Sequence, residues 1–318
     1  MKSLHARDAH RYAVTSLCML SGRTKQAFYK KNEERLMQSA AMRAFALEYA
    51  EGIRAEDPGI GMMKLWYMYQ HEFRAQECIL GRDRFCDLLA EHGMKVRQKV
   101  RKPRTTDSTH GLPTYPDIVK EFIPTAPNQL WVSDITYITI WVDAEHYVFC
   151  YLSLVMDAYT KEIVGWAVGD SLRADFPIAA LKTALKRIEG KEHTLIHHSD
   201  RGVQYASAEY VKLLTKHNIR ISMTETGDPK DNAQAERINN TMKNELLKGI
   251  TFHSIKEVQA AVAAAVDFYN NRRPHMSIDM MTPAEAAAMT GRLDKKWTSW
   301  REKAIEEKEC LAPCIGYP

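Results

Sequence analysis

The segment from Asp231 to Leu246 carries side chains that could bind a divalent cation and a phosphate group at one place. Its composition predicts a helix with Asp231 at its start, where a side-chain oxygen can accept unpaired backbone N–H groups. Glu236 and Lys243 are seven residues apart. That is nearly two helical turns, so both side chains project from one face. An ordinary solvated helix face explains the same charges, and the rest of the chain must decide between these interpretations.

Two further carboxylates stand where a folded protein gains little from an acid. Asp134 interrupts the apolar, β-prone run 129–142, which predicts a central strand covered on both faces. Asp200 follows a short strand within 194–202, at the strand end where sites form in α/β sheets. A lone carboxylate inside a strand costs several kcal/mol unless it is paired or bound to a cation. Asp134 could therefore also cap a turn or pair with an arginine.

The expected element order, β-β-β-α-β-α-β-α, can bring Asp134, Asp200 and Glu236 together over the centre of a mixed sheet with flanking helices. Three adjacent carboxylates repel and raise one another's pKa unless cations lie among them. Mg²⁺ or Mn²⁺ would suit such oxygen ligands, and two ions about 4 Å apart can assist displacement at phosphorus. His197 and His198 adjoin Asp200 and could line this site or simply pack at the strand end. A phosphate-binding loop of the P-loop kind is absent from the sequence.

Apolar patterns predict the elements that position these acids. Two strands, Tyr147–Val155 and Ile163–Val168, would complete an antiparallel meander. Asp175 is expected to cap the next helix. The remaining predicted elements are a helix after Ser207, a strand Ile219–Met223, a helix that the capping box Ser254–Glu257 begins, and a helix with Pro283 at its first position.

The N-terminal third reads as helical and could bind DNA. Two short helices around Ser21-Gly22 are predicted over residues 10–31, followed by one helix over 33–56. A second pair of helices is predicted over 61–72 and 81–92. Helix-turn-helix units have this pattern, although any helical hairpin shares it. The residues expected to face the duplex are Arg23, Lys25, Gln26, Lys30, Lys31, Arg82 and Arg84.

Basic residues are concentrated before the expected sheet. Residues 1–110 contain 20 Lys and Arg against 13 Asp and Glu, a net charge of +7, whereas the remainder carries −3. A basic arm that tracks phosphates is predicted from Lys95, Arg97, Lys99, Arg101, Lys102 and Arg104, although a solvated linker has the same composition. We therefore expect four parts: DNA-binding regions over 1–60 and 61–110, a catalytic core over 120–290, and a tail over 291–318.

The composition indicates a globular protein of two or three domains. The chain has 318 residues, of which 45% are hydrophobic and 26% charged. It contains no apolar run of membrane-spanning length and no signal peptide at Met1. Six scattered cysteines do not suggest a disulfide framework, and Cys310 and Cys314 read as free thiols. A reducing cytoplasm fits this composition.

Four stretches together resemble insertion-sequence transposases that have a retroviral-integrase catalytic core and are encoded as the downstream frame of two-frame elements. Between Asp200 and Glu236 lie 35 residues, the spacing characteristic of that family. The resemblance covers about residues 120–290. The stretches are Trp131-Val-Ser-Asp-Ile-Thr-Tyr137, His198-Ser-Asp-Arg-Gly-Val-Gln-Tyr205, Asp231-Asn-Ala-Gln-Ala-Glu236 with Lys243-Asn-Glu-Leu246, and Tyr269-Asn-Asn-Arg-Arg-Pro-His275 followed by Thr282-Pro-Ala-Glu285.

The resemblance implies an RNase H-like fold and a DNA transposase. It implies that Asp134, Asp200 and Glu236 hold two Mg²⁺ (or Mn²⁺) ions, with Lys243 near the DNA end. It also implies nicking at the element ends, attack by the freed 3′-hydroxyl on another phosphodiester, and a homo-oligomer on paired double-stranded ends. The family usually has Asn-Pro-Tyr-Asp-Asn where this chain has Asp228-Pro-Lys-Asp-Asn232. Many relatives also use an upstream-frame helix-turn-helix protein, which is a further candidate partner here.

Two other functions remain to be weighed. Another RNase H-like nuclease, acting on junctions or RNA–DNA hybrids, would share the acids, but the basic N-terminal helices and the 35-residue spacing count against it. A DNA-binding regulator without catalysis would not need the acids, and all three are present together with Lys243.

Overall fold

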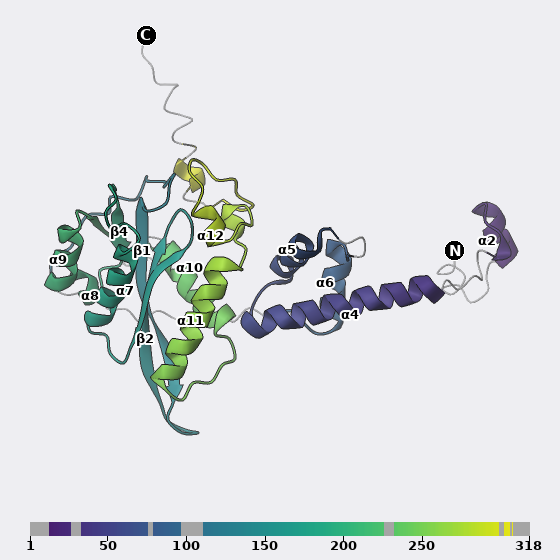
Figure 1. The fold of residues 1–318 in the computed structure, drawn as a ribbon, viewed down its shortest axis with the longest axis horizontal. Coiled ribbons are helices and arrows are strands. Elements are labelled where there is room, and N and C mark those ends of the chain that lie inside the picture. The colour runs from purple at the N-terminus through teal and green to yellow at the C-terminus, as the bar shows by residue number, and fades with distance from the viewer. Residues whose placement is uncertain are drawn as a thin grey trace, which may run out of the picture.

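A computed structural model of the chain describes residues 13–26, 33–75, 79–96, 111–225, 232–298, 302–305 and 307. A sheet with helices on both faces forms its larger part, and a group of helices from the N-terminal third lies beside that part (Figure 1). None of the helices within the described ranges is both long enough and apolar enough to span a membrane.

The sheet has five strands in the order β3-β2-β1-β4-β5. β1 is antiparallel to β2, β2 is antiparallel to β3, and both β4 and the following β5 run parallel to β1. The predicted mixed sheet and the central place of the first strand are therefore confirmed. The strands are β1 (Leu130–Trp141), β2 (Tyr147–Asp157), β3 (Ile163–Gly169), β4 (Ile196–Ser199) and β5 (Arg220–Met223).

Helices cover the two faces of the sheet, and each face has its own apolar cluster. On one face α7 (Asp175–Leu185) and α9 (Ala208–Lys216) pack around Trp131 and Tyr210. A four-residue helix that was not predicted, α8 (Val203–Ala206), precedes α9. The other face carries α10 (Ala233–Thr241) and α11 (Ile255–Asn271), as Figure 1 shows.

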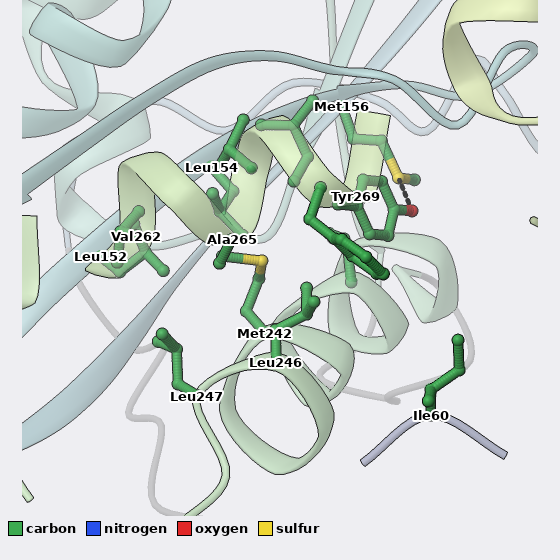
Figure 2. Close-up of a cluster of buried hydrophobic side chains, with 14 of the residues drawn as sticks. Ile60, Leu152, Leu154, Met156, Met242, Leu246, Leu247, Val262, Ala265 and Tyr269 are labelled. Carbon is green, nitrogen blue, oxygen red and sulfur yellow. Dashed lines mark hydrogen bonds between the residues drawn. The ribbon is translucent and has the colours of Figure 1, made fainter. Parts of the chain in front are cut away.

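The second cluster ties the sheet to the helices that follow it. Leu152, Leu154 and Met156 of β2 lie against Met242 and Leu246, and Val262, Ala265 and Tyr269 of α11 close the cluster (Figure 2). The Tyr269 hydroxyl donates a hydrogen bond to the Met156 sulfur, 3.9 Å away. The same buried cluster includes Tyr69 and Phe85 from the N-terminal helices, which therefore share a core with the sheet.

The segment from Asp231 to Leu246 is not one regular helix, contrary to prediction. α10 (Ala233–Thr241) begins after Asn232, and Asp231 itself lies outside the described residues. A π-helical turn, η1 (Met242–Leu246), follows, in which Leu247 N–H donates to the carbonyl five residues back, on Met242. Such turns interrupt the 3.6-residue repeat and often occur at functional sites. Lys243 lies in this wider turn.

Most predicted helix starts are confirmed. The side chains of Ser207, Ser254 and Thr282 each accept a hydrogen bond from a backbone N–H three residues on. The prediction for Asp175 is wrong, because Ala174 is the N-cap and Asp175 is the first helical residue. An acid there still interacts favourably with the helix dipole. The short α12 (Pro283–Ala286) and the 3₁₀ turn η2 (Met276–Ile278) complete the core.

The N-terminal third is helical, as predicted. Its helices are α2 (Val14–Leu20), α4 (Glu33–Glu56), α5 (Met62–Phe73) and α6 (Arg82–Glu91). Residues 25 and 26 are helical after the turn at Gly22, and the rest of that predicted second helix, 27–32, lies outside the described residues. So does most of the basic arm, from residue 97 to residue 110, and so do Cys310 and Cys314.

Candidate active site

Asp134 and Asp200 occupy neighbouring positions on two parallel strands. The last paired residues of β1 and β4 are Ser133 and Ser199, and the next residue of each chain is one of the two aspartates. Because β1 continues beyond this point whereas β4 ends, the two aspartates lie where β1 loses its neighbouring strand on this side. The strand-end position expected for Asp200 is thus observed.

Asp134 is held by hydrogen bonds, and no arginine among the described residues pairs with it. Its Oδ2 accepts from the Asn239 side chain at 2.8 Å, and its Oδ1 accepts from Ile135 N–H at 2.8 Å. Burial, together with the nearby charges of Asp200 and Glu236, raises the pKa of Asp134 to about 7, against the lowering effect of these two hydrogen bonds. The three acids are therefore close enough to interact, and their negative charges are not balanced by the two hydrogen bonds.

Two asparagines fix α10 against β1 on either side of Glu236. Asn232, the N-cap residue, donates its side-chain N–H to the Ser133 carbonyl at 3.0 Å. Asn239 makes the bond to Asp134, and both asparagines are buried. Glu236 lies between these anchors and is partly buried. Sequence reasoning missed both asparagines, although their seven-residue spacing around Glu236 could have indicated a shared face.

The loop after β4 holds Asp200 through its own backbone. Gly202 N–H donates to Asp200 Oδ1 at 2.9 Å. A β-carbon at Gly202 would lie 3.0 Å from that oxygen and 2.9 Å from Gln204 Oε1, so only glycine fits without a shift. Arg201 Nε donates to the Thr224 carbonyl at 2.6 Å and joins this loop to the end of β5. The loop is therefore built tightly around the acid.

The two histidines beside Asp200 pack inside the protein. His197 Nε2 lies 2.8 Å from Ser133 Oγ and 2.9 Å from the Tyr210 hydroxyl, and burial lowers the pKa of His197 to about 3. His198 Nδ1 lies 2.9 Å from Ser222 Oγ. A neutral, enclosed His197 supports the strands beneath the acids, so the packing interpretation of these residues holds.

Tyr205 is a buried group that the sequence did not single out as part of the site. Its hydroxyl has no hydrogen-bond partner among the described residues. Burial raises the pKa of Tyr205, and the charges of Asp134 and Asp200 contribute to the rise. Tyr205 is therefore a buried polar group without a described partner, close enough to Asp134 and Asp200 for their charges to act on it.

Lys243 contacts β1 through the ring of Tyr137. Its ammonium nitrogen is 3.7 Å from the ring centroid of Tyr137, which follows Asp134 by three residues on β1. The sequence did not identify this aromatic ring as part of the site, and the predicted place of Lys243 near the DNA end stays a prediction.

The donor set fits a hard cation, although it is not closed around one. No three Asp, Glu, His or Cys side chains within the described ranges are gathered tightly enough to hold a metal ion. Asp134, Asp200 and Glu236 nevertheless offer carboxylate oxygens, and burial together with the charges of Asp200 and Glu236 raises the pKa of Asp134. Mg²⁺ and Mn²⁺ prefer such oxygen ligands.

The predicted DNA-contacting side chains fall into two groups. Arg23, Lys25 and Gln26 near α2 are exposed, as are Arg82 and Arg84 of α6 and Lys95 after it, although Arg82 pairs with Asp83 at 2.9 Å. The other predicted contacts lie outside the described residues: Lys30, Lys31, Arg97, Lys99, Arg101, Lys102 and Arg104. So do residues Asp228 to Asp231 of the loop in which this chain differs from the usual family sequence.

A second set of charges joins the N-terminal helices to the core, away from the three acids. Arg273 Nε donates to Glu245 Oε1 at 2.7 Å and lies 3.7 Å from Asp57 Oδ2. Lys64 Nζ also reaches Glu245, at 3.4 Å. Glu245 and Arg273 belong to two of the stretches that carry the family resemblance, and here they pair with each other.

Comparison with known proteins agrees with this geometry. Two profiles described as integrase core domain match residues 124–229 and 217–283. The transposase for insertion sequence element IS629 of Shigella sonnei is 34% identical over 229 residues, which cover 71% of this chain and 73% of the relative. The uncharacterized 31 kDa protein of insertion element IS600, also from Shigella sonnei, is 36% identical over 217 residues, covering 68% and 78%.

A solved structure is also similar to part of the chain. The catalytic core domain of HTLV-2 integrase shares 18% identity with a TM-score of 0.39, covering 51% of this chain and 97% of that one. The extent and identity of the curated matches decide the family. The chain belongs to the insertion-sequence transposases that carry an integrase core domain.

Proposed function

We propose that the chain cleaves DNA at the ends of its insertion sequence and joins the freed 3′ ends to a target, with Asp134, Asp200 and Glu236 as metal ligands. The adjacent register of Asp134 and Asp200, with α10 fixed beside them by Asn232 and Asn239, is the observation that supports this proposal most strongly. Family membership alone supports polynucleotidyl transfer but does not assign the residues.

The three acids would hold two Mg²⁺ or Mn²⁺ ions. When bound, such ions activate an attacking oxygen and stabilise a leaving one during displacement at phosphorus. The contribution of the chain itself is positional. The Gly202 amide orients Asp200, Asn239 orients Asp134, and α10 presents Glu236 between its two asparagine anchors. Lys243 would bind a DNA phosphate beside them, because an ammonium group attracts phosphate as a point charge.

The partners that follow from this proposal are double-stranded element ends and target DNA. We also propose that two or more copies of the chain act on paired ends, and that an upstream-frame helix-turn-helix protein assists end recognition. The exposed Arg23, Lys25, Arg84 and Lys95 support a DNA-binding role for the N-terminal third, since exposed basic side chains provide the phosphate contacts that dominate affinity.

The test uses the purified full chain and a labelled duplex that carries the end sequence read from DNA flanking the gene. We expect nicking and strand joining that require Mg²⁺ or Mn²⁺. Glu236→Gln and Asp200→Asn should abolish both products and leave duplex binding within about threefold. Asp175→Asn, which changes an exposed acid at the start of α7, is the matched control and should keep full activity.

Three outcomes would separate the alternatives. Cleavage that survives Asp200→Asn would show that the site assignment is wrong. Cleavage of RNA–DNA hybrids or junctions in preference to element ends would favour another nuclease of the same fold. DNA binding without cleavage, even after the upstream-frame protein is added, would favour a regulator.

A further inference from the structure

Tyr137 occupies an unusual position for an aromatic residue of a central strand. It lies on β1 three residues after Asp134, and 45% of its surface is exposed. Its ring packs edge to face on Phe149 of β2, with centroids 4.9 Å apart and an interplanar angle of 63°. One aromatic neighbour therefore fixes the orientation of the ring while a large part of it remains accessible.

The ring contacts the ammonium group that the proposed function places on DNA. Lys243 Nζ lies 3.7 Å from the Tyr137 centroid, well within the distance at which a cation is attracted to the face of an aromatic ring. Lysine has a long and flexible side chain, and holding it in one place costs conformational entropy. A contact with a fixed ring offsets part of that cost before DNA arrives.

The π-helical turn places Lys243 over β1. Met242 and Leu246 of the same turn are buried in the cluster of Figure 2, so the turn is anchored on both sides of Lys243. Since the backbone of Lys243 is anchored, the remaining freedom lies in its side chain. Tyr137, three residues beyond Asp134 on β1, limits that freedom.

We infer that Tyr137 is a positioning residue, whose ring holds the Lys243 ammonium group where it can bind a DNA phosphate beside the three acids. The inference rests on the proposed function, because it concerns how Lys243 meets DNA. The aromatic face, and not the phenol hydroxyl, is what acts on the ammonium group. Tyrosine and phenylalanine should therefore be equivalent at this position, whereas an aliphatic side chain should not.

The experiment compares Tyr137→Phe, Tyr137→Leu, Lys243→Gln and the double variant Tyr137→Leu/Lys243→Gln in the full chain. Binding of the end duplex is measured over a range of salt concentrations, together with single-turnover strand joining. Tyr137→Phe should match the wild type. Tyr137→Leu should weaken duplex binding about threefold to fivefold, the effect of losing one exposed cation–π contact. Lys243→Gln should lower the slope of log affinity against log salt by about one phosphate contact.

The decisive comparison is the effect of Tyr137→Leu in the two backgrounds. If Tyr137 acts through Lys243, the leucine change should have no further effect on binding once Lys243 is glutamine. An equal effect in both backgrounds, or a change in melting temperature with unchanged DNA binding, would overturn the inference. Duplex binding by Lys243→Gln as tight as that of the wild type would also overturn the inference. The proposed function would still hold in that case if Mg²⁺-dependent joining persists. Absence of Mg²⁺-dependent joining by the wild type, with the upstream-frame protein present, would instead refute the proposed function itself.

Discussion

The buried charges between the N-terminal helices and the core make a quantitative prediction about stability. Arg273 is enclosed, with only 5% of its side chain exposed, and it faces two acids, Glu245 at 2.7 Å and Asp57 at 3.7 Å. Burial, together with the like charge of Glu245, raises the pKa of Asp57 to about 7, whereas Arg273 and Lys64 lower the pKa of Glu245. Near neutral pH the site therefore carries one full carboxylate charge on Glu245 and a partly protonated Asp57.

Glu245→Gln should accordingly cost less than the loss of an ordinary buried ion pair. Glutamine still accepts the Arg273 hydrogen bond, and removal of the Glu245 charge lowers the pKa of Asp57, so that Asp57 ionises and takes over as counter-ion. We expect a loss of about 1–2 kcal/mol in the free energy of unfolding. Asp57→Asn alone should not lower it and should raise it by up to about 4 kcal/mol at pH 7, because asparagine resembles the protonated acid and folding then requires no proton uptake. The double variant leaves Arg273 without a carboxylate and should lose about 3–5 kcal/mol.

Urea denaturation at pH 7, followed by circular dichroism, measures these differences through the midpoint at constant m-value. Glu91→Gln is the matched control, since it breaks the exposed pair with Arg43 and should cost no more than about 0.5 kcal/mol. The reasoning requires the double variant to lose at least about 1 kcal/mol more than the sum of the two single changes. Additive losses within about 0.5 kcal/mol would refute it, because Asp57 would then not substitute for Glu245.

Two further predictions concern pH and the loop of Asp200. Between about pH 4 and pH 7 the folded state keeps a proton on Asp57 that the unfolded chain has released. The free energy of unfolding should therefore fall, by at most about 4 kcal/mol, as the pH is raised from 4 to 7. Asp57→Asn should reduce this dependence on pH. The charged groups around Asp57 are Glu245, Arg273, Lys64 and Arg54. If the free energy of unfolding, measured by urea titration from pH 5 to pH 8, depends on pH as strongly in the variant as in the wild type, the prediction is wrong. Gly202→Ala should lower strand joining at least about tenfold while leaving duplex affinity nearly unchanged, because its β-carbon would lie 3.0 Å from Asp200 Oδ1; wild-type joining would show that the loop tolerates the shift.

Much of the sheet was predictable because its signals are local. The apolar runs of β1, β2 and β3 and the capping residues Ser207, Ser254 and Thr282 determine their elements within a few residues. The acids were identified because a carboxylate in an apolar strand, such as Asp134, requires compensation. Asp134 and Asp200 are adjacent because of the register between β1 and β4. That register depends on parallel pairing of two distant segments, which the sequence does not give.

Contacts between distant segments were not predictable in the same way. Asn239 reads as an ordinary helical asparagine until its partner, Asp134, is known to lie 105 positions earlier. The π-helical turn at Met242 was missed because its sequence has good helix propensity, and the extra residue is accommodated by burial of Met242 and Leu246. Pairing of Lys243 with Tyr137 and of Glu245 with Arg273 likewise depends on that turn and not on local spacing.

The π-helical turn connects two parts of the molecule that the sequence presents as separate. Lys243 extends from it toward β1, whereas Glu245 extends toward the N-terminal helices and accepts Gly59 N–H on its carbonyl at 3.0 Å. A β-carbon at Gly59 would lie 2.4 Å from the Glu245 α-carbon, so the two backbones approach as closely as glycine permits. A shift of the N-terminal helices on binding DNA would therefore act on the turn that carries Lys243. Because only one residue separates the two side chains, we expect the docking of those helices to affect the placement of Lys243, the proposed DNA-binding residue.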